Sequence, residues 1–355
     1  MIPVTIHHVA QKARCSVASV SRVVNGTGPA SPAMRARVEV AVAELGFQPS
    51  EVGRSLARRS RRILGVLVPS VTNPIFAASL AGIQDRARAA GLSVLIAQSD
   101  YDPGREREAV EALLAERPAG LVLTVCDPYD SLALDLVERQ GIPTVLVYND
   151  PGDRRISAVT VDSRGASRAL VEQMIALGHR RIVFVAGHFA ASDRSRLRYL
   201  GYADAVSAAG LPVEPPTEVD FIVGADDVDL TELVSRLRPT AIVASNDLLA
   251  LSVIASLRRL GLDVPGQVSV AGFDGIALGR LVDPPLTTVE QPAGTMGVAA
   301  VSLLLELAAG RCESQRLLIN HTFRPGGTLQ PPVAQVRLSK RRQSSQNLVH
   351  QESSR

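Results

Sequence analysis

From residue 63 onward, short apolar runs rich in β-branched residues alternate with stretches of helical periodicity. One series extends from ILGVLVP at residues 63–69 to PTVLVY at residues 143–148, and a second extends from AVTVD at residues 158–162 through DFIVG at 220–224 to VSVAGFD at residues 268–274. The helices expected between these runs lie at 74–90, 104–116, 130–140, 164–177, 194–209, 228–237 and 247–260. Buried strands that alternate with amphipathic helices are typical of parallel sheets covered on both faces. The sequence therefore predicts an α/β core of two doubly wound lobes.

The expected core occupies residues 63–334. Lobe one is expected at about 63–160 plus 292–320, and lobe two at about 161–291 plus 321–334. In such folds ligands bind outside the carboxyl ends of the strands, so two facing lobes predict a binding cleft between them. The chain has no P-loop, no G-x-S-x-G, no H-E-x-x-H and no dinucleotide-binding glycine pattern, which disfavours an enzyme. Three scattered cysteines fit neither a disulfide framework nor a zinc site, and neither a metal nor another cofactor is expected.

Residues 1–49 have the pattern of three short helices. Ile6, Val9, Ala10 and Ala13 form one apolar stripe, and Ser16 is a suitable N-cap for a second helix whose inward side chains are Val20, Val23 and Val24. Ser31 and Pro32 open a third helix that ends at Gly46. A helix, a tight turn, a second helix and a supporting third helix are typical of the helix-turn-helix motif.

The outward face of the second helix carries small and polar side chains. Val17 and Ala18 can contact a thymine methyl group, and Arg22 can donate two hydrogen bonds to guanine. Ser16, Ser21 and Asn25 suit phosphate oxygens, which position a helix without reading the base sequence. This face predicts entry into the major groove of DNA, with a purely structural three-helix cap as the alternative.

The charges of the chain are divided unevenly. The overall formal charge is +3, yet residues 1–62 hold ten Lys or Arg against three Glu, whereas residues 63–336 hold 23 basic against 31 acidic side chains. A basic head on an acidic body indicates a protein that grips a polyanion with one end, although a solvated cationic segment would have the same composition.

The stretch VTIHHVAQKARCSVASVSRVVNG at residues 4–26 resembles the N-terminal signature of the lactose-repressor/galactose-repressor family of bacterial transcription factors. The resemblance adds Thr5 to the expected DNA contacts. His8, Arg14 and Cys15 depart from the usual Asp, Gly and Val. Because Gly usually makes the turn, we expect a left-handed backbone at Arg14, at a cost of about 1 kcal/mol that a phosphate contact would offset.

Residues 50–62 resemble the hinge helix of the same family, which folds when two copies meet in the minor groove. Leu56 falls at the position of the leucine that wedges between base steps and kinks the duplex. Gly53 replaces the usual alanine, which is expected to weaken the isolated helix by roughly 1 kcal/mol. The alternative is a flexible basic linker.

The core resembles the family's effector-binding domain through NPIFAASLAGIQ, LGHRRIVFVAG, RLRYLGY, SNDLLAL, VSVAGFD and PPLTTVEQP, in the family's order. The effector-binding residues implied by this resemblance are Phe76, Asn149, Arg198, Phe221, Asn246, Asp274 and Gln291. Core packing is the alternative for Phe76, helix capping for Asn246 and a turn for Asp274. Tyr148 and Asn149 stand where the family usually has Asp-Arg, so the polar pattern of the effector is expected to differ from that of common sugar inducers.

The resemblance implies a sequence-specific transcriptional regulator, most often a repressor, controlled by a small metabolite such as a sugar or a sugar derivative. The scattered cysteines and the lack of an apolar run long enough for a signal peptide or a membrane span predict a cytoplasmic protein. Its partners would be a second copy of the chain and a pseudo-palindromic duplex operator, with no membrane. The tail 335–355 is polar and basic, which is typical of a disordered segment, and it lacks the leucine heptad of the tetrameric family members. The alternative function is the solute-binding protein of a transport system.

Overall fold

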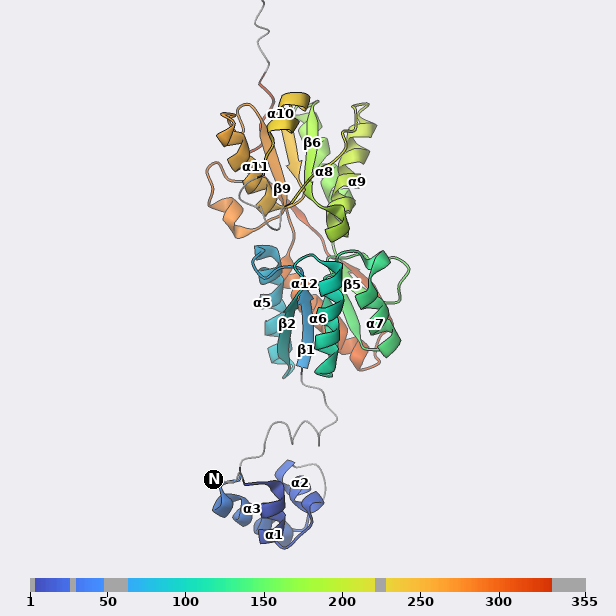
Figure 1. The fold of residues 1–355 in the computed structure, drawn as a ribbon, viewed down its shortest axis with the longest axis vertical. Coiled ribbons are helices and arrows are strands. Elements are labelled where there is room, and N and C mark those ends of the chain that lie inside the picture. Colours follow the sequence, from blue (N-terminus) through green and yellow to red (C-terminus); the bar gives the residue numbers. More distant parts are fainter. Residues whose placement is uncertain (1–3, 26–29, 48–62, 221–227, 334–355) are drawn as a thin grey trace, which may run out of the picture. The chain divides into compact units, whose positions relative to one another are not determined.

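The computed structural model describes residues 4–25, 30–47, 63–220 and 228–333 (Figure 1). Phe221, Leu56 with the rest of the expected hinge, and the tail 335–355 lie outside the described residues. The chain forms two compact units. Of the described residues, unit 1 comprises 4–25, 30–47, 63–72, 76–160 and 293–317, and unit 2 comprises 73–75, 161–220, 228–292 and 318–333.

The head consists of three helices, α1 (Ile6–Lys12), α2 (Val17–Asn25) and α3 (Pro32–Leu45). Their shared core contains Val9, Ala10, Ala13, Val20, Val23, Val38 and Ala41. The predicted inward stripes of the first two helices are therefore confirmed. The predicted start and end of α3 are confirmed as well, because the Ser31 Oγ accepts a hydrogen bond from the Met34 N–H at 3.3 Å and Gly46 adopts φ +60°.

Unit 1 contains a six-stranded sheet in the order β11-β5-β4-β3-β1-β2. The strands are β1 (Ile63–Val68), β2 (Ser93–Gln98), β3 (Gly120–Leu123), β4 (Thr144–Val147), β5 (Ser157–Thr160) and β11 (Arg316–Leu318). The helices are α5 (Pro74–Ala89), α6 (Pro103–Ala115), α7 (Leu132–Gln140) and α12 (Ala293–Ala308), with a 3-10 turn η1 (Pro128–Asp130) before α7. Helices α6 and α7 share a hydrophobic core with β1, β3 and β4, and α12 packs on β3, β4 and β5.

Unit 2 contains a second six-stranded sheet in the order β12-β10-β9-β8-β6-β7. Its strands are β6 (Ile182–Gly187), β7 (Thr217–Val219), β8 (Ala241–Ala244), β9 (Ser269–Asp274), β10 (Thr287–Glu290) and β12 (Thr322–Arg324). Its helices are α8 (Ser163–Ala176), α9 (Asp193–Ala208), α10 (Thr231–Leu237) and α11 (Asp247–Arg259), with short 3-10 turns η2 (Phe189–Ala191) and η3 (Ala277–Arg280).

Both faces of the unit 2 sheet are covered by helices, as the continuous apolar strands predict. In β6, Val183 and Val185 belong to the core that includes α11, whereas Phe184 between them belongs to the core that includes α8 and α9. Successive side chains of a strand point to opposite faces, so the two cores lie on opposite sides of the sheet. The prediction of doubly wound sheets is confirmed.

The predicted helices agree with the observed ones to within three residues at each end, and two features of the sheets differ from the expectations. The strand expected in DFIVG is wrong in position, because β7 lies at Thr217–Val219 and residues 221–227 are outside the described part. The sheet of unit 2 is also not wholly parallel. β12 pairs antiparallel with β10, where Val289 lies opposite Phe323.

Candidate functional site

The turn between α1 and α2 is closed by backbone and serine hydrogen bonds. Arg14 adopts φ +49°, which confirms the left-handed conformation expected where the family usually has Gly. The N–H of Cys15 donates to the Ala10 carbonyl at 3.1 Å and ends α1. The Ser16 Oγ then accepts from the N–H of Ser19 at 3.1 Å, which confirms Ser16 as the N-cap of α2. The turn therefore fixes the direction in which α2 leaves α1.

The outward face of α2 presents few large side chains. Ala18 and Arg22 are exposed, and Val17 and Ser21 are half-buried. The Nε of Arg22 donates to the Ala18 carbonyl at 3.3 Å, so the guanidinium lies along the helix surface. Such a face has the small size and the donor that readout of a major groove requires.

Thr5 and His8 close the first turn of α1. Thr5 is the exposed N-cap residue, and its backbone N–H donates to the His8 Nδ1 at 3.1 Å. His8 therefore makes the reciprocal cap that an acidic residue would make at this position. The departure from the family pattern leaves the cap intact.

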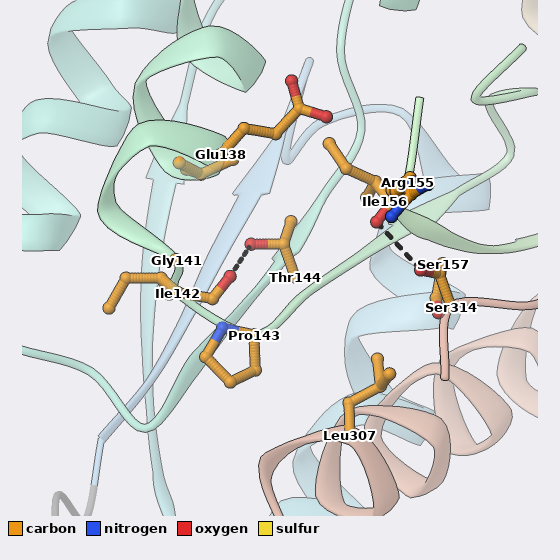
Figure 2. A pocket seen from close by; sticks show the side chains of 11 residues that line it. Glu138, Gly141, Ile142, Pro143, Thr144, Arg155, Ile156, Ser157, Leu307 and Ser314 are labelled. Atoms are coloured by element: carbon orange, nitrogen blue, oxygen red, sulfur yellow. Dashed lines mark hydrogen bonds between the residues drawn. The ribbon is translucent and has the colours of Figure 1, made fainter. Parts of the chain in front are cut away.

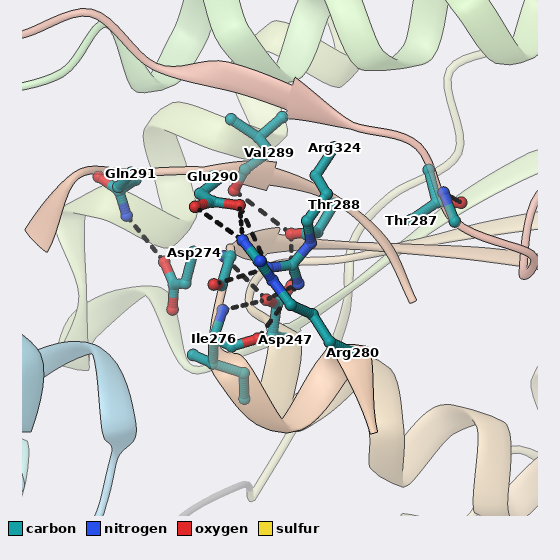
Figure 3. Close-up of polar contacts among 12 residues, drawn as sticks. Asp247, Asp274, Ile276, Arg280, Thr287, Thr288, Val289, Glu290, Gln291 and Arg324 are labelled. Atoms are coloured by element: carbon teal, nitrogen blue, oxygen red, sulfur yellow. Dashed lines mark hydrogen bonds and ion pairs between the residues drawn. The ribbon is translucent and has the colours of Figure 1, made fainter. Parts of the chain in front are cut away.

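Three predicted effector-binding residues come together at the carboxyl ends of the unit 2 strands. Arg198 projects from α9, Asp274 is the last residue of β9, and Gln291 follows β10. The Arg198 Nη2 lies 3.2 Å from the Asp274 Oδ1, and the Gln291 Nε2 donates to the same oxygen at 2.8 Å (Figure 3 shows Asp274 and Gln291). A guanidinium, a carboxylate and an amide thus form one polar cluster.

The polar cluster is buried and its hydrogen bonding is incomplete. Arg198, Asp274 and Gln291 are at most 5% exposed, and the Arg198 guanidinium carbon lies 3.8 Å from the centre of the Phe273 ring. Arg198 also donates through Nη1 to the Ser245 carbonyl. Among the described residues, the Arg198 Nε, the Gln291 Oε1 and the Ser245 Oγ have no hydrogen-bond partner. A buried polar atom without a partner costs about 1–3 kcal/mol, so three in one cluster indicate a place for a polar ligand.

Burial acts on both charges of the cluster. It lowers the pKa of Arg198, and the Asp274 carboxylate opposes this effect. Burial likewise raises the pKa of Asp274, and the Arg198 guanidinium opposes it. Asp274 also has φ +119°, a conformation that residues other than glycine rarely adopt and that is found at functional sites more often than elsewhere.

Two predicted effector residues have defined structural contacts. The Asn246 Oδ1 accepts from the Leu249 N–H at 2.9 Å, so Asn246 caps α11, which is the alternative that its sequence position left open. Asn149 is fully buried. Its side-chain amide accepts from the Val125 N–H and donates to the Val125 carbonyl, both at 2.9 Å. The Asn149 side chain therefore links the segment that follows β4 to the segment that follows β3.

Phe76 lies near the start of α5 and is 4% exposed. Its ring packs edge-on against Tyr148, with ring centres 5.7 Å apart and planes at 79°. Tyr148 has φ +71°. The aromatic pair anchors the chain directly after β4, and the core-packing alternative for Phe76 is thereby satisfied.

Comparisons with known proteins agree with this arrangement. Residues 5–50 match the model of bacterial regulatory proteins of the lacI family, and residues 171–329 match the periplasmic binding protein-like domain. Catabolite control protein A of Priestia megaterium is 31% identical over 304 residues, which are 85% of this chain and 91% of that protein. The regulator GalR of Salmonella typhimurium is 33% identical over 332 residues, 90% of this chain and 93% of that protein. The chain belongs to the lactose-repressor/galactose-repressor family.

A solved structure supports the same family over nearly the whole chain. The lac repressor dimer bound to operator and the anti-inducer ONPF superposes with a TM-score of 0.77 at 29% identity, covering 92% of this chain and 99% of that one. This member of the lactose-repressor/galactose-repressor family is thus a DNA-binding transcriptional regulator with an effector-binding core. Its matched relatives are regulators and not enzymes, and the helix-turn-helix head disfavours the transport alternative.

Ser245 was missed by the sequence reasoning. It directly follows β8, it is fully buried, and its carbonyl accepts from Arg198. A small polar residue at the carboxyl end of a central strand is the signal that could have identified it, because that edge carries the ligands of doubly wound folds. The sequence analysis of this family member names the next residue, Asn246, and not Ser245.

A hollow of about 410 Å³ lies within unit 1, beside the start of β4 and β5 (Figure 2). Its hydroxyl groups are used by the chain itself. Thr144 donates to the Ile142 carbonyl at 2.9 Å, Ser314 donates to the Arg155 carbonyl at 3.0 Å, and Ser157 accepts from the Gln315 N–H at 3.0 Å. The polar cluster of unit 2 is therefore the stronger candidate for effector binding in this regulator.

Neither a metal-binding cluster nor a membrane-spanning helix is found among the described residues. Within residues 4–25, 30–47, 63–220 and 228–333, no three His, Cys, Asp or Glu side chains gather in a way that could hold a metal ion. In the same ranges no helix has the length and apolar character that crossing a membrane requires.

Proposed function

We propose that this chain is a cytoplasmic repressor whose operator binding is controlled by a small polar effector held by the polar cluster of unit 2. The observation that carries the proposal is the meeting of Arg198, Asp274 and Gln291 with buried atoms that lack partners. A sugar or sugar derivative suits this cluster, because each ligand hydroxyl both donates and accepts and so satisfies an amide oxygen, a serine hydroxyl and a guanidinium N–H together.

We infer that the head reads a pseudo-palindromic duplex operator as part of a homodimer. The lac repressor that superposes on this chain is a dimer bound to operator, which supports the inference. In this reading Arg22 donates to guanine, Val17 and Ala18 contact thymine methyl groups, and Leu56 enters the minor groove. The expected contacts to the DNA backbone are those of Thr5, Ser16, Ser21 and Asn25.

The proposed domain limits are the head at 1–49, the hinge at 50–62, the core at 63–334 and the tail at 335–355. Phe76, Asn149, Phe221 and Asn246 stay predictions as effector contacts. Proton or group transfer is not proposed for the polar cluster, because the switch needs only a difference in effector affinity between the DNA-binding and DNA-free states.

A ligand screen on the full chain tests the effector site. Thermal shifts are measured with panels of sugars, sugar acids, polyols and nucleobases. Each compound that raises the melting temperature is then titrated by calorimetry into the unchanged chain and into Arg198→Lys, and the two affinities are compared. Lys cannot reproduce the fork of guanidinium donors, so the affinity is expected to fall by about tenfold or more. Arg164→Lys is the matched control, since Arg164 is half exposed and pairs with Asp204 on the helices of the same unit. Equal affinities in all three proteins would refute the site.

A shift assay with genomic fragments tests the DNA reader. Arg22→Ala is expected to cost about 1–3 kcal/mol on the selected operator and little on unrelated duplexes, because only base contacts discriminate sequences. Arg88→Ala is the control, since this exposed arginine lies on α5 and not on the three helices of the head. A chain that binds every fragment equally, with no compound of the panels altering that binding, would contradict the proposal.

A further inference from the structure

The first residue of α11, Asp247, is fully buried beside the polar cluster and does not belong to it. Its Oδ2 accepts from the backbone N–H groups of Gly275 and Ile276, each at 2.8 Å. Its Oδ1 accepts from the Thr288 hydroxyl on β10. Figure 3 shows these contacts converging on the carboxylate of Asp247. One side chain thus binds the two residues that directly follow Asp274.

The turn that begins at Asp274 has an unusual backbone conformation. Asp274 has φ +119° and Gly275 has φ +79°, so two consecutive residues lie in the region that L-residues avoid. Such a turn persists only where its surroundings hold it. Successive N–H groups in a turn of this kind form a concave site for an anion, and the Asp247 carboxylate supplies that anion from within the chain.

The carbonyl groups of Gly275 and Ile276 are held by a second charged side chain, Arg324. The Arg324 Nη1 donates to the Gly275 carbonyl at 2.9 Å, and Nη2 donates to the Ile276 carbonyl at 3.1 Å. Arg324 also pairs with Glu290 at 3.2 Å. Both N–H groups and both carbonyl groups of Gly275 and Ile276 therefore have a charged partner.

Two glycines leave room for this arrangement. A Cβ at Gly272 would lie 2.3 Å from the Asp247 Oδ1, and a Cβ at Gly275 would lie 2.4 Å from the Glu290 Cγ. Both distances are shorter than any real contact of a Cβ atom. A side chain at either position would therefore displace the Asp247 carboxylate or the Glu290 side chain that pairs with Arg324.

We propose that Asp247 is a positioning residue of the effector site. Its carboxylate anchors the turn at Gly275 and Ile276, and the anchored turn holds the Asp274 side chain where Arg198 and Gln291 meet it. The inference rests on the proposed function, since it assigns Asp247 a role in the same polar cluster. Asp247 itself contacts no effector in this arrangement.

The ionisation of Asp247 provides a readout of this role. Burial and the neighbouring Asp274 carboxylate raise the pKa of Asp247 to about 7, against the opposing effects of Thr288, Ile276 and Arg324. The charged groups that face it are Asp274 on β9 and Arg324 on β12, with Glu290 on β10 beside Arg324. Because this pKa lies above the ordinary value, protonation favours the closed turn over an open one in which the carboxyl is hydrated, so protection of the turn is expected to rise as the pH falls through neutrality.

Hydrogen exchange on the full chain without ligand tests the anchor. The Gly275 and Ile276 amides, corrected for intrinsic exchange, are expected to gain about tenfold protection between pH 8 and pH 6. Asp247→Asn keeps a side-chain oxygen for both amides and donates to Thr288 without titrating, so its protection should be equal at the two pH values. Asp247→Ala should lose tenfold or more of the protection at both pH values. Protection that is independent of pH in the unchanged chain would overturn the proposal.

A spectroscopic signal separates positioning from plain stabilisation. The Arg198 Nε–H resonance, assigned by its loss in Arg198→Lys, reports the geometry of the polar cluster. It is expected to shift in Asp247→Ala, to stay near its original position in Asp247→Asn, and to stay in place in Leu257→Ala. Leu257 is fully buried on the same helix, ten residues beyond Asp247, so its truncation destabilises the hydrophobic core of unit 2 without removing a contact to the Gly275 or Ile276 backbone.

The outcomes distinguish this inference from the proposed function. An unmoved Arg198 signal in Asp247→Ala, or an equal shift in Leu257→Ala, would refute the positioning role even if an effector binds. A compound screen without a single hit would count against the effector site. It would not change what hydrogen exchange and the Arg198 resonance show about the positioning role of Asp247.

Discussion

Arg198 and Asp274 form an ion pair in which the two side chains are only 6% and 5% exposed, with their closest atoms 3.2 Å apart. The pair joins α9 to the end of β9, and Gln291 completes it from the end of β10. Breaking a buried pair by removing one partner costs more than the pair itself contributes, because the remaining charge stays in an environment that solvates it poorly.

Asp274→Ala is therefore expected to destabilise unit 2 by about 3–5 kcal/mol, since Arg198 then remains buried without its carboxylate. The free energy of unfolding is measured by denaturant unfolding of the full chain, and the hydrogen-exchange protection of the unit 2 amides is measured alongside it. The double variant Asp274→Ala, Arg198→Met should recover much of the loss, because it removes the uncompensated cation. A double variant as unstable as the single one would show that the charge is not the cause.

Arg14→Gly is expected to stabilise the head by about 1 kcal/mol, because Gly adopts φ +49° without the steric cost that a side chain carries. DNA binding is expected to change in the opposite direction. The loss of a phosphate contact lowers operator affinity and reduces the slope of log affinity against log salt by about one. Melting of the head and titrations at several salt concentrations measure the two effects. Tighter operator binding by Arg14→Gly would contradict the phosphate contact.

The sequence predicted the elements of this fold well because its patterns are strong. Uninterrupted apolar runs such as ILGVLV belong to strands buried on both faces, and the capped helix beginning at Ser31 has the same limits in the structure. β12 was not predicted. Its three residues, Thr322–Arg324, form a strand only because they pair with β10. That pairing joins residues that lie far apart in the sequence.

The candidate site was predictable to a similar degree. Family resemblance named Arg198, Asp274 and Gln291, and these three residues meet in the structure. The roles of Ser245 and Asp247 depend on which neighbouring strand end each one faces, which no local pattern encodes. The two backbone bonds that occupy the Asn149 amide likewise appear only when β3 and β4 lie side by side.

Asp247→Asn is expected to change the pH dependence of stability. The pKa of Asp247 is raised to about 7 in the folded chain, above its unfolded value of roughly 3.9, so the folded state holds the proton more tightly. The contribution to stability is therefore present at low pH and is lost as the pH rises from about 4 to 7, by up to about 1.4 kcal/mol per unit. Relative to the unchanged chain, the variant should gain stability across this window. A constant difference between the two proteins from pH 4 to 8 would contradict the assignment.

His179 is expected to affect stability in the opposite sense. It is fully buried, its Nε2 donates to the Gln330 carbonyl at 2.9 Å, and its Nδ1 faces the Thr240 hydroxyl at 3.0 Å. Because a carbonyl only accepts, the neutral ring carries its proton on Nε2 and accepts from Thr240 through Nδ1. Burial lowers the pKa of His179, so the unfolded chain takes up a proton at a higher pH than the folded chain does.

The stabilising effect of neutral His179 is therefore present above about pH 6.5 and is lost as the pH falls below that value. His179→Gln keeps the donor to Gln330 and removes the titrating group, so its unfolding free energy should depend less on pH between 5 and 7. Denaturant unfolding at half-unit steps of pH, with His188→Gln as the exposed histidine control, measures the difference. Parallel pH profiles for the unchanged chain and His179→Gln would contradict this role of His179.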